Sequence, residues 1–132
     1  MTLAWRYVST TGLVLAVACG GGGGGEATRE SVESCLREAN AEVTTNEDDL
    51  YSIADPIWDG EGLVTTIGEN DAALAVMRSE SDAQRLVSCA ELFYEGMDTP
   101  SDDVLKWYGS VVVEWSEAPT DEETTTLEGC VP

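Results

Sequence analysis

The apolar residues that follow position 28 recur with the period of a helix in three stretches, which predicts three helices. The first is expected over 29–39 and the second over 82–95, and the third begins at Thr120. Ser81 and Thr120 are each followed three residues later by Gln or Glu, as in the capping box that starts many helices. The buried side of the second helix is expected to consist of Leu86, Cys89, Ala90 and Phe93.

Short runs of apolar and β-branched residues bounded by turn residues predict strands in the remaining stretches. Two strands over 63–67 and 72–78 flank a Gly-Glu-Asn-Asp run and are expected to form a hairpin, and another strand is expected over 110–115. A short extended piece is expected over 41–45, whereas 104–108 fits neither period clearly. This order of elements favours an α+β fold with a small, mostly antiparallel sheet and helices packed on one of its faces.

The first eighteen residues have the three parts of an export signal. A short cationic start with Arg6 precedes an apolar stretch over 7–18, which is shorter than the roughly 20 residues needed to span a bilayer. The small residues Ala16 and Ala18 precede Cys19, and six glycines follow it. This arrangement resembles the lipobox of bacterial lipoprotein signal peptides, although the leucine that usually stands three places before the cysteine lies one place earlier.

The lipobox resemblance implies that the Cys19 thiol receives a diacylglyceryl group and that a dedicated peptidase then removes residues 1–18. Two acyl chains anchor a protein firmly, whereas one chain holds it only marginally. Residues 19–27 are expected to form the lipidated cysteine and a Gly-rich tether, and 28–132 a single domain at the extracytoplasmic face of the cell membrane. The alternatives are an ordinary secretory signal and an uncleaved anchor.

The charge of the chain is strongly negative. It holds 26 acidic and 6 basic residues, and because Arg6 is one of the six, five remain after the signal, a formal charge of −21. Nucleic-acid binding needs clustered Lys and Arg, so this balance argues against it. A solvated surface that keeps the domain soluble is the favoured explanation. A salt-adapted host and the binding of cations or of a basic partner are the alternatives.

The residues present argue against catalysis. The chain contains no histidine, which is the commonest general base and the usual partner of a catalytic serine. Lys106 is the only lysine, and no Ser-x-x-Lys motif surrounds it. We therefore expect no catalytic residues, no enzyme activity and no cofactor besides the lipid on Cys19.

Segment 46–61 is the least regular part of the domain, and we expect one or two helical turns followed by a loop. Its carboxylates Asp55, Asp59 and Glu61 are weak candidate ligands for calcium, which takes six to eight oxygens. The spacing does not match an EF-hand loop, so the favoured interpretation is a solvated loop without a metal. Zinc is also not expected, since histidine and closely spaced cysteines are absent.

Three cysteines remain for the domain: Cys35, Cys89 and Cys130. Cys35 and Cys130 lie on the apolar sides of the terminal helices, and export permits disulfides. A bond between them would close a loop of about 95 residues and stabilise the fold by roughly 4–5 kcal/mol in the chain-entropy model. Cys89 is interpreted as a small buried apolar residue. Another pairing, or no disulfide, stays open at this point.

The aromatic residues suggest either core or binding positions. Trp115 is assigned to the core because it shares the apolar face of the strand over 110–115. Trp58, Trp107 and Tyr108 are more often core in so small a domain, but if exposed they could anchor a protein or stack on a sugar.

Two further motifs extend the resemblance to lipoproteins. The run Cys-Leu-Arg-Glu-Ala over 35–39 and the run Pro-Thr-Asp-Glu-Glu over 119–123, followed by Cys130, are similar to motifs in small lipoproteins of high-GC Gram-positive bacteria. This similarity favours the Cys35–Cys130 pairing and implies no particular activity.

Three hypotheses about function follow. We favour a lipid-anchored domain that binds an envelope protein without catalysis. The alternatives are a small-ligand or divalent-cation binding module that uses segment 46–61, and an inhibitor-like domain in which that segment protrudes.

Overall fold

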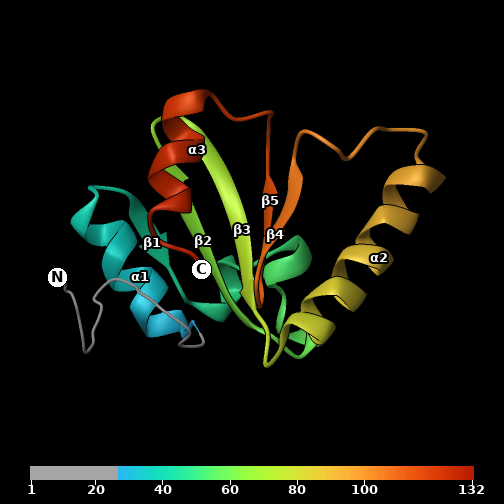
Figure 1. Ribbon diagram of the computed structural model, residues 1–132, viewed down its shortest axis with the longest axis horizontal. Coiled ribbons are helices and arrows are strands. Elements are labelled where there is room, and N and C mark those ends of the chain that lie inside the picture. The colour runs from blue at the N-terminus through green and yellow to red at the C-terminus, as the bar shows by residue number, and fades with distance from the viewer. Residues whose placement is uncertain (1–26) are drawn as a thin grey trace, which may run out of the picture.

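The computed structural model describes residues 27–132, so the expected signal over 1–18 and the lipidated Cys19 lie outside the described residues. Along the described part, the α-helices are separated by groups of strands (Figure 1). They are α1 Arg29–Glu38, β1 Glu42–Thr44, β2 Glu61–Ile67, β3 Asn70–Val76, α2 Glu80–Gly96, β4 Leu105–Tyr108, β5 Val111–Trp115 and α3 Asp121–Glu128. Three short 3₁₀ turns between β1 and β2 are η1 Glu47–Asp49, η2 Ser52–Ala54 and η3 Pro56–Trp58.

The strands form one five-stranded sheet in the order β1-β2-β3-β5-β4, and all neighbours are antiparallel. The predicted hairpin is β2 and β3, and its turn places Gly68 at a φ of 64°, a conformation that glycine adopts without strain. The ambiguous stretch over 104–108 is strand β4, which pairs with β5. The predicted α+β class and antiparallel sheet are therefore confirmed.

Both faces of the sheet are covered, whereas the sequence suggested helices on one face. Val113 and Trp115 face α1 and α3 in one apolar cluster, while Val112 of the same strand belongs to a second cluster under α2 and η2. Figure 1 shows α1 and α3 at one side of the sheet and α2 at the other. The reason is that the central strands are apolar at consecutive positions, so one covered face would leave the other apolar face in water.

The second helix differs from its prediction in its start and in its buried side. Its N-cap is Ser79, not Ser81, and the Ser79 hydroxyl accepts the backbone N–H of Asp82 at 3.1 Å. Phe93 is exposed and Cys89 is half-buried. The stripe that is buried consists of Ala83, Leu86, Val87 and Ala90. Both stripes have helical spacing, but the sheet face beneath carries small residues, against which alanines pack closely.

A disulfide joins Cys35 of α1 to Cys130, which lies just beyond the end of α3 rather than on the helix as expected, and their Cα atoms are 5.5 Å apart. This confirms the favoured pairing, and Cys89 is a free cysteine. Capping boxes start both helices, with Thr28 and Ser31 at α1 and the predicted Thr120 and Glu123 at α3.

Gly62 in β2 allows segment 46–61 to pack closely on the sheet. A Cβ atom at this position would overlap the carbonyl oxygen of Ala54 and lie 2.8 Å from its carbonyl carbon. We expect Gly62→Ala to lower the free energy of unfolding by roughly 1–3 kcal/mol, as overpacking usually does. Urea unfolding followed by circular dichroism measures this loss.

Gly96→Ala is the matched control, because a Cβ there meets no atom within 4 Å. This variant is expected to be neutral or slightly stabilising, since alanine loses less backbone entropy than glycine in a helix. Equal stability of the two variants would contradict the proposed close packing of η2 on β2.

Candidate functional site

A small polar cluster fixes the position of segment 46–61 and of α2. Glu114 of β5 accepts a hydrogen bond from the Tyr94 hydroxyl at 2.5 Å and another from the Ser52 hydroxyl. Burial raises the pKa of Tyr94 above its ordinary value, and the bond to Glu114 acts in the same direction, so the phenol stays protonated and donates. Glu114 thereby connects β5 with η2 and α2, and Ser52, one of its two partners, has a φ of 54°.

Segment 46–61 does not protrude. Ile53 and Ala54 are buried in the second apolar cluster, against Ala73 and Ala75 of β3. The fixed part of the segment continues into η3, where Asp55 caps the turn by accepting the backbone N–H of Ile57 at 3.0 Å. The segment is therefore packed on the sheet and presents only its outer side chains to solvent.

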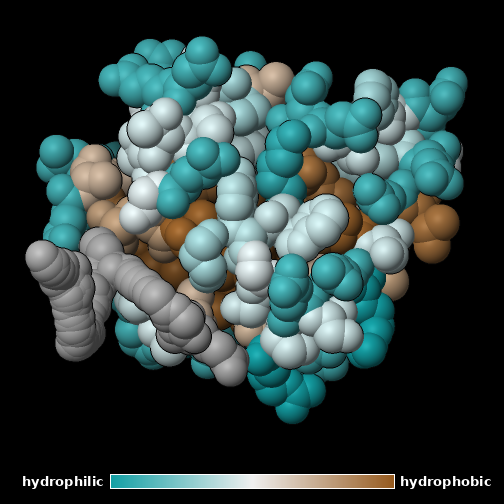
Figure 2. Space-filling model, viewed as in Figure 1, coloured by the Kyte–Doolittle hydropathy of each residue, from teal (hydrophilic) through white to brown (hydrophobic). Residues whose placement is uncertain are grey.

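These outer side chains form an apolar surface with one residue of α2. We define the apolar surface as Ile57, Trp58 and Phe93. Ile57 is 76% exposed and Phe93 is 63% exposed, while the Trp58 and Phe93 rings form a T-shaped pair at a centroid distance of 6.5 Å. Figure 2 shows hydrophobic residues at the surface over α2, at the right of the view.

A cavity of about 200 Å³ adjoins the apolar surface. Trp58, Met77, Leu86 and Cys89 supply its apolar wall, and charged side chains supply the remainder. These charged residues are Asp59, Arg78, Asp82 and Arg85. Two of the five basic residues that follow the expected signal thus lie beside the apolar surface, so this region carries both signs of charge within an acidic protein.

Two residues of the apolar surface were not found by sequence reasoning. The sequence places Phe93 on the buried side of its helix, and Ile57 shares the helical spacing of the apolar residues in the irregular segment, which gives no sign that it is exposed. The only sign in the sequence that Phe93 could be exposed is that the apolar residues of this helix fit two overlapping stripes of helical spacing. Trp58 had been weighed as either core or binding, and it is partly buried at this surface.

The three weak metal candidates are not gathered into one site. Asp55 caps η3, Asp59 ends it in a left-handed conformation with a φ of 64°, and Glu61 begins β2. Within residues 27–132, no three or more His, Cys, Asp or Glu side chains are grouped as metal ligands would be.

A larger groove of about 750 Å³ lies at β4. Its lining comes from every residue of β4, from the residues just before it, from α2 and from α3. The acidic lining residues are Glu91, Asp102, Asp103 and Glu128, the aromatic ones are Trp107, Tyr108 and Trp115, and the basic one is Lys106. We call this the β4 groove.

The two aromatic residues of β4 point to opposite faces of the sheet. Trp107 is 44% exposed, whereas Tyr108 is half-buried and donates its hydroxyl hydrogen bond to Glu128 at 3.0 Å. Burial, reinforced by that bond, raises the pKa of Tyr108 to about 12, so the phenol is neutral near pH 7. The sequence leaves both a core and a binding position open for Trp107, and it is exposed because β4 is the last strand of the sheet.

None of the helices in residues 27–132 has the length and apolar character needed to cross a membrane. No protein family, no curated protein and no solved structure matches the chain.

Proposed function

We propose that this chain is a lipid-anchored, extracytoplasmic domain that binds an envelope protein without catalysis. The lipobox-like run before Cys19 supports the anchor, and the absence of histidine supports a role without catalysis. The observation that carries the binding role is the apolar surface of Ile57, Trp58 and Phe93.

The composition of the apolar surface is that of a binding site. Exposed aromatic and large aliphatic side chains that cluster are typical anchors of protein interfaces. The Trp58 and Phe93 rings hold each other in place, so little side-chain entropy is lost when a partner packs on them. Glu114 binds α2, which carries Phe93, and η2, which directly precedes the η3 turn of Trp58, and this favours a surface that is already formed before binding.

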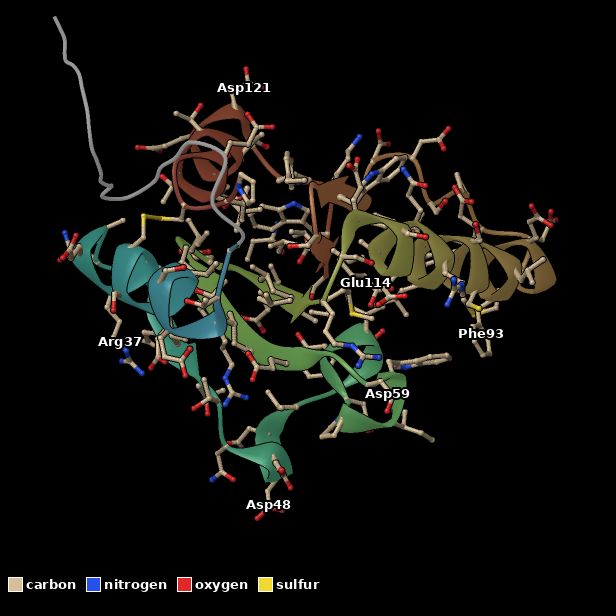
Figure 3. All side chains as sticks on the ribbon, turned by 60° about the horizontal axis from the view of Figure 1, so that its bottom comes forward. Arg37, Asp48, Asp59, Phe93, Glu114 and Asp121 are labelled. Carbon is tan, nitrogen blue, oxygen red and sulfur yellow. A yellow bond between two sulfur atoms is a disulfide. The ribbon has the colours of Figure 1, made fainter. Side chains whose placement is uncertain are left out.

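The position of the surface also suits an anchored protein. The tether would join the domain just before α1, and Figure 3 shows Phe93 and Asp59 at the side of the molecule opposite Arg37 of α1. The apolar surface would then be free to meet a partner rather than press against the anchoring segment.

Photo-cross-linking in cells that express the full chain tests this proposal. A photoreactive amino acid at position 57 is expected to give a discrete adduct with one membrane-fraction protein. Phe93→Ser in the same chain should reduce that adduct at least about fivefold, because truncating an aromatic anchor commonly weakens binding by this much or more. Cys19→Ser should abolish the incorporation of labelled fatty acid into the chain, because it removes the thiol that accepts the diacylglyceryl group.

Two controls distinguish binding at the apolar surface from non-specific cross-linking. Leu92→Ser removes a side chain of similar exposure, 66%, that points about 100° away from Phe93 on α2, and it should leave the adduct unchanged. The same photoreactive group at position 48 in η1 should give no discrete adduct. No adduct at 57, or equal adducts at both positions, would contradict the proposed binding surface.

A further inference from the structure

The outer edge of β4 carries unpaired backbone groups. The backbone N–H of Trp115 donates to the carbonyl of Val104 at 2.8 Å, and hydrogen bonding alternates along an antiparallel pair. Lys106 and Tyr108 therefore point their peptide groups at β5, and Trp107 points its N–H and C=O away. No strand in residues 27–132 pairs with this edge, which Figure 1 shows as the last of the sheet on the side of α2.

The opposite edge of the sheet is less accessible. Strand β1 has only three residues, and the Arg37 guanidinium donates to the carbonyl of Val43 at 2.9 Å. Short edge strands and side chains that occupy edge groups are ordinary ways of preventing strand addition. Of the two edges, β4 is thus the one where an extended chain can bind.

The negative charge around the β4 edge favours a positively charged partner segment. Four carboxylates line the groove against the single ammonium of Lys106. Trp107 adds an exposed aromatic face, which attracts Lys and Arg side chains. A second copy of this chain would bring a like charge of about −20 to the same edge, and repulsion of that size disfavours self-pairing.

We propose that the β4 groove binds an extended, lysine- or arginine-rich segment of a partner protein, which adds to β4 as a further strand. The Trp107 peptide group supplies backbone hydrogen bonds, and Glu91, Asp102 and Asp103 attract the basic side chains. The groove is distinct from the apolar surface, because Glu91 and Phe93 lie on opposite flanks of α2.

The test uses residues 20–132, which contain every described element and the disulfide. The probe is a blocked hexapeptide that alternates lysine and threonine, titrated at low salt and followed by NMR. Saturable shifts are expected along β4, together with slower hydrogen exchange of the Trp107 amide. N-methylation of alternate peptide amides keeps the charge but removes strand pairing, and it should weaken binding about tenfold.

Protein variants separate strand addition from diffuse attraction. Asp102→Asn with Asp103→Asn should weaken binding roughly fivefold, whereas Glu47→Gln with Asp48→Asn makes the same charge change in η1 and should have little effect. Trp107→Pro should bind more weakly than Trp107→Ala, since it also removes the outward N–H. Phe93→Ser should bind normally, so failure of the apolar surface as a binding site would leave this proposal standing.

Three results would overturn the proposal. Equal weakening by the two acidic pairs would show diffuse charge attraction. Undiminished binding of the N-methylated peptide would show that no strand is added. A concentration-dependent dimer that protects the Trp107 amide would make a second copy the occupant of the edge.

Discussion

Replacing Cys35 and Cys130 together with alanine is expected to lower the free energy of unfolding by roughly 4–5 kcal/mol. The bond joins residues 95 positions apart, so it restricts almost the whole unfolded domain. A loss of this size approaches the entire stability of many small domains, which is about 5–15 kcal/mol. Urea unfolding of the oxidised domain, followed by circular dichroism, measures the difference.

Cys89→Ala is the matched control for the disulfide prediction. Cys89 is a free, half-buried cysteine, so this variant should change stability by less than about 1 kcal/mol. Reducing agent should destabilise the unmodified domain and leave the double variant unchanged. Equal unfolding midpoints for the oxidised domain and the double variant would refute the expected contribution of the bond.

Trp115→Ala is expected to cost about 3–5 kcal/mol, the usual range for removing a buried large aromatic side chain. Trp115 is only 2% exposed and packs in the cluster between the sheet and the two terminal helices. Alanine would leave a cavity that α1 and α3 can close only by moving, and the disulfide between these helices restricts such movement. Chemical unfolding of the variant gives the loss directly.

Trp107→Ala provides the comparison for Trp115. Trp107 is a residue of the same type in the adjacent strand, but it is 44% exposed at the sheet edge. Its loss should cost less than about 1.5 kcal/mol, because most of the cavity term is absent at an open surface. If both variants lost the same stability, the two tryptophans would contribute alike and the assignment of Trp115 to the core would be wrong.

The local charge differs between the apolar surface and the β4 groove. Beside the apolar surface, Arg78 and Arg85 locally offset the negative charge. At the β4 groove the carboxylates outnumber the single lysine. A partner of the apolar surface is therefore selected mainly by shape and apolar contact, whereas a partner of the groove is selected by positive charge and should bind more weakly as salt rises.

Much of the local structure could be predicted because it depends on neighbouring residues. Thr28 and Thr120 start helices through hydrogen bonds to residues three positions away. The turn between β2 and β3 depends only on the ability of Gly68 to adopt a positive φ. The sequence favours the Cys35–Cys130 pairing but leaves other pairings open, and the fold brings the two cysteines together, with Cys130 just beyond the end of α3. The α+β class follows from these elements.

The tertiary structure decided which side chains are exposed. The residues of α2 form two overlapping stripes, and only the small residues of the sheet face beneath determine that Val87 is buried and Phe93 is not. Similarly, nothing local to β4 makes it the last strand, yet that position exposes Trp107 and leaves its peptide group without a partner strand among residues 27–132. Exposure depends on what packs opposite a residue, and that neighbour is distant in the sequence, so the apolar surface and the β4 groove could be recognised only in the folded domain.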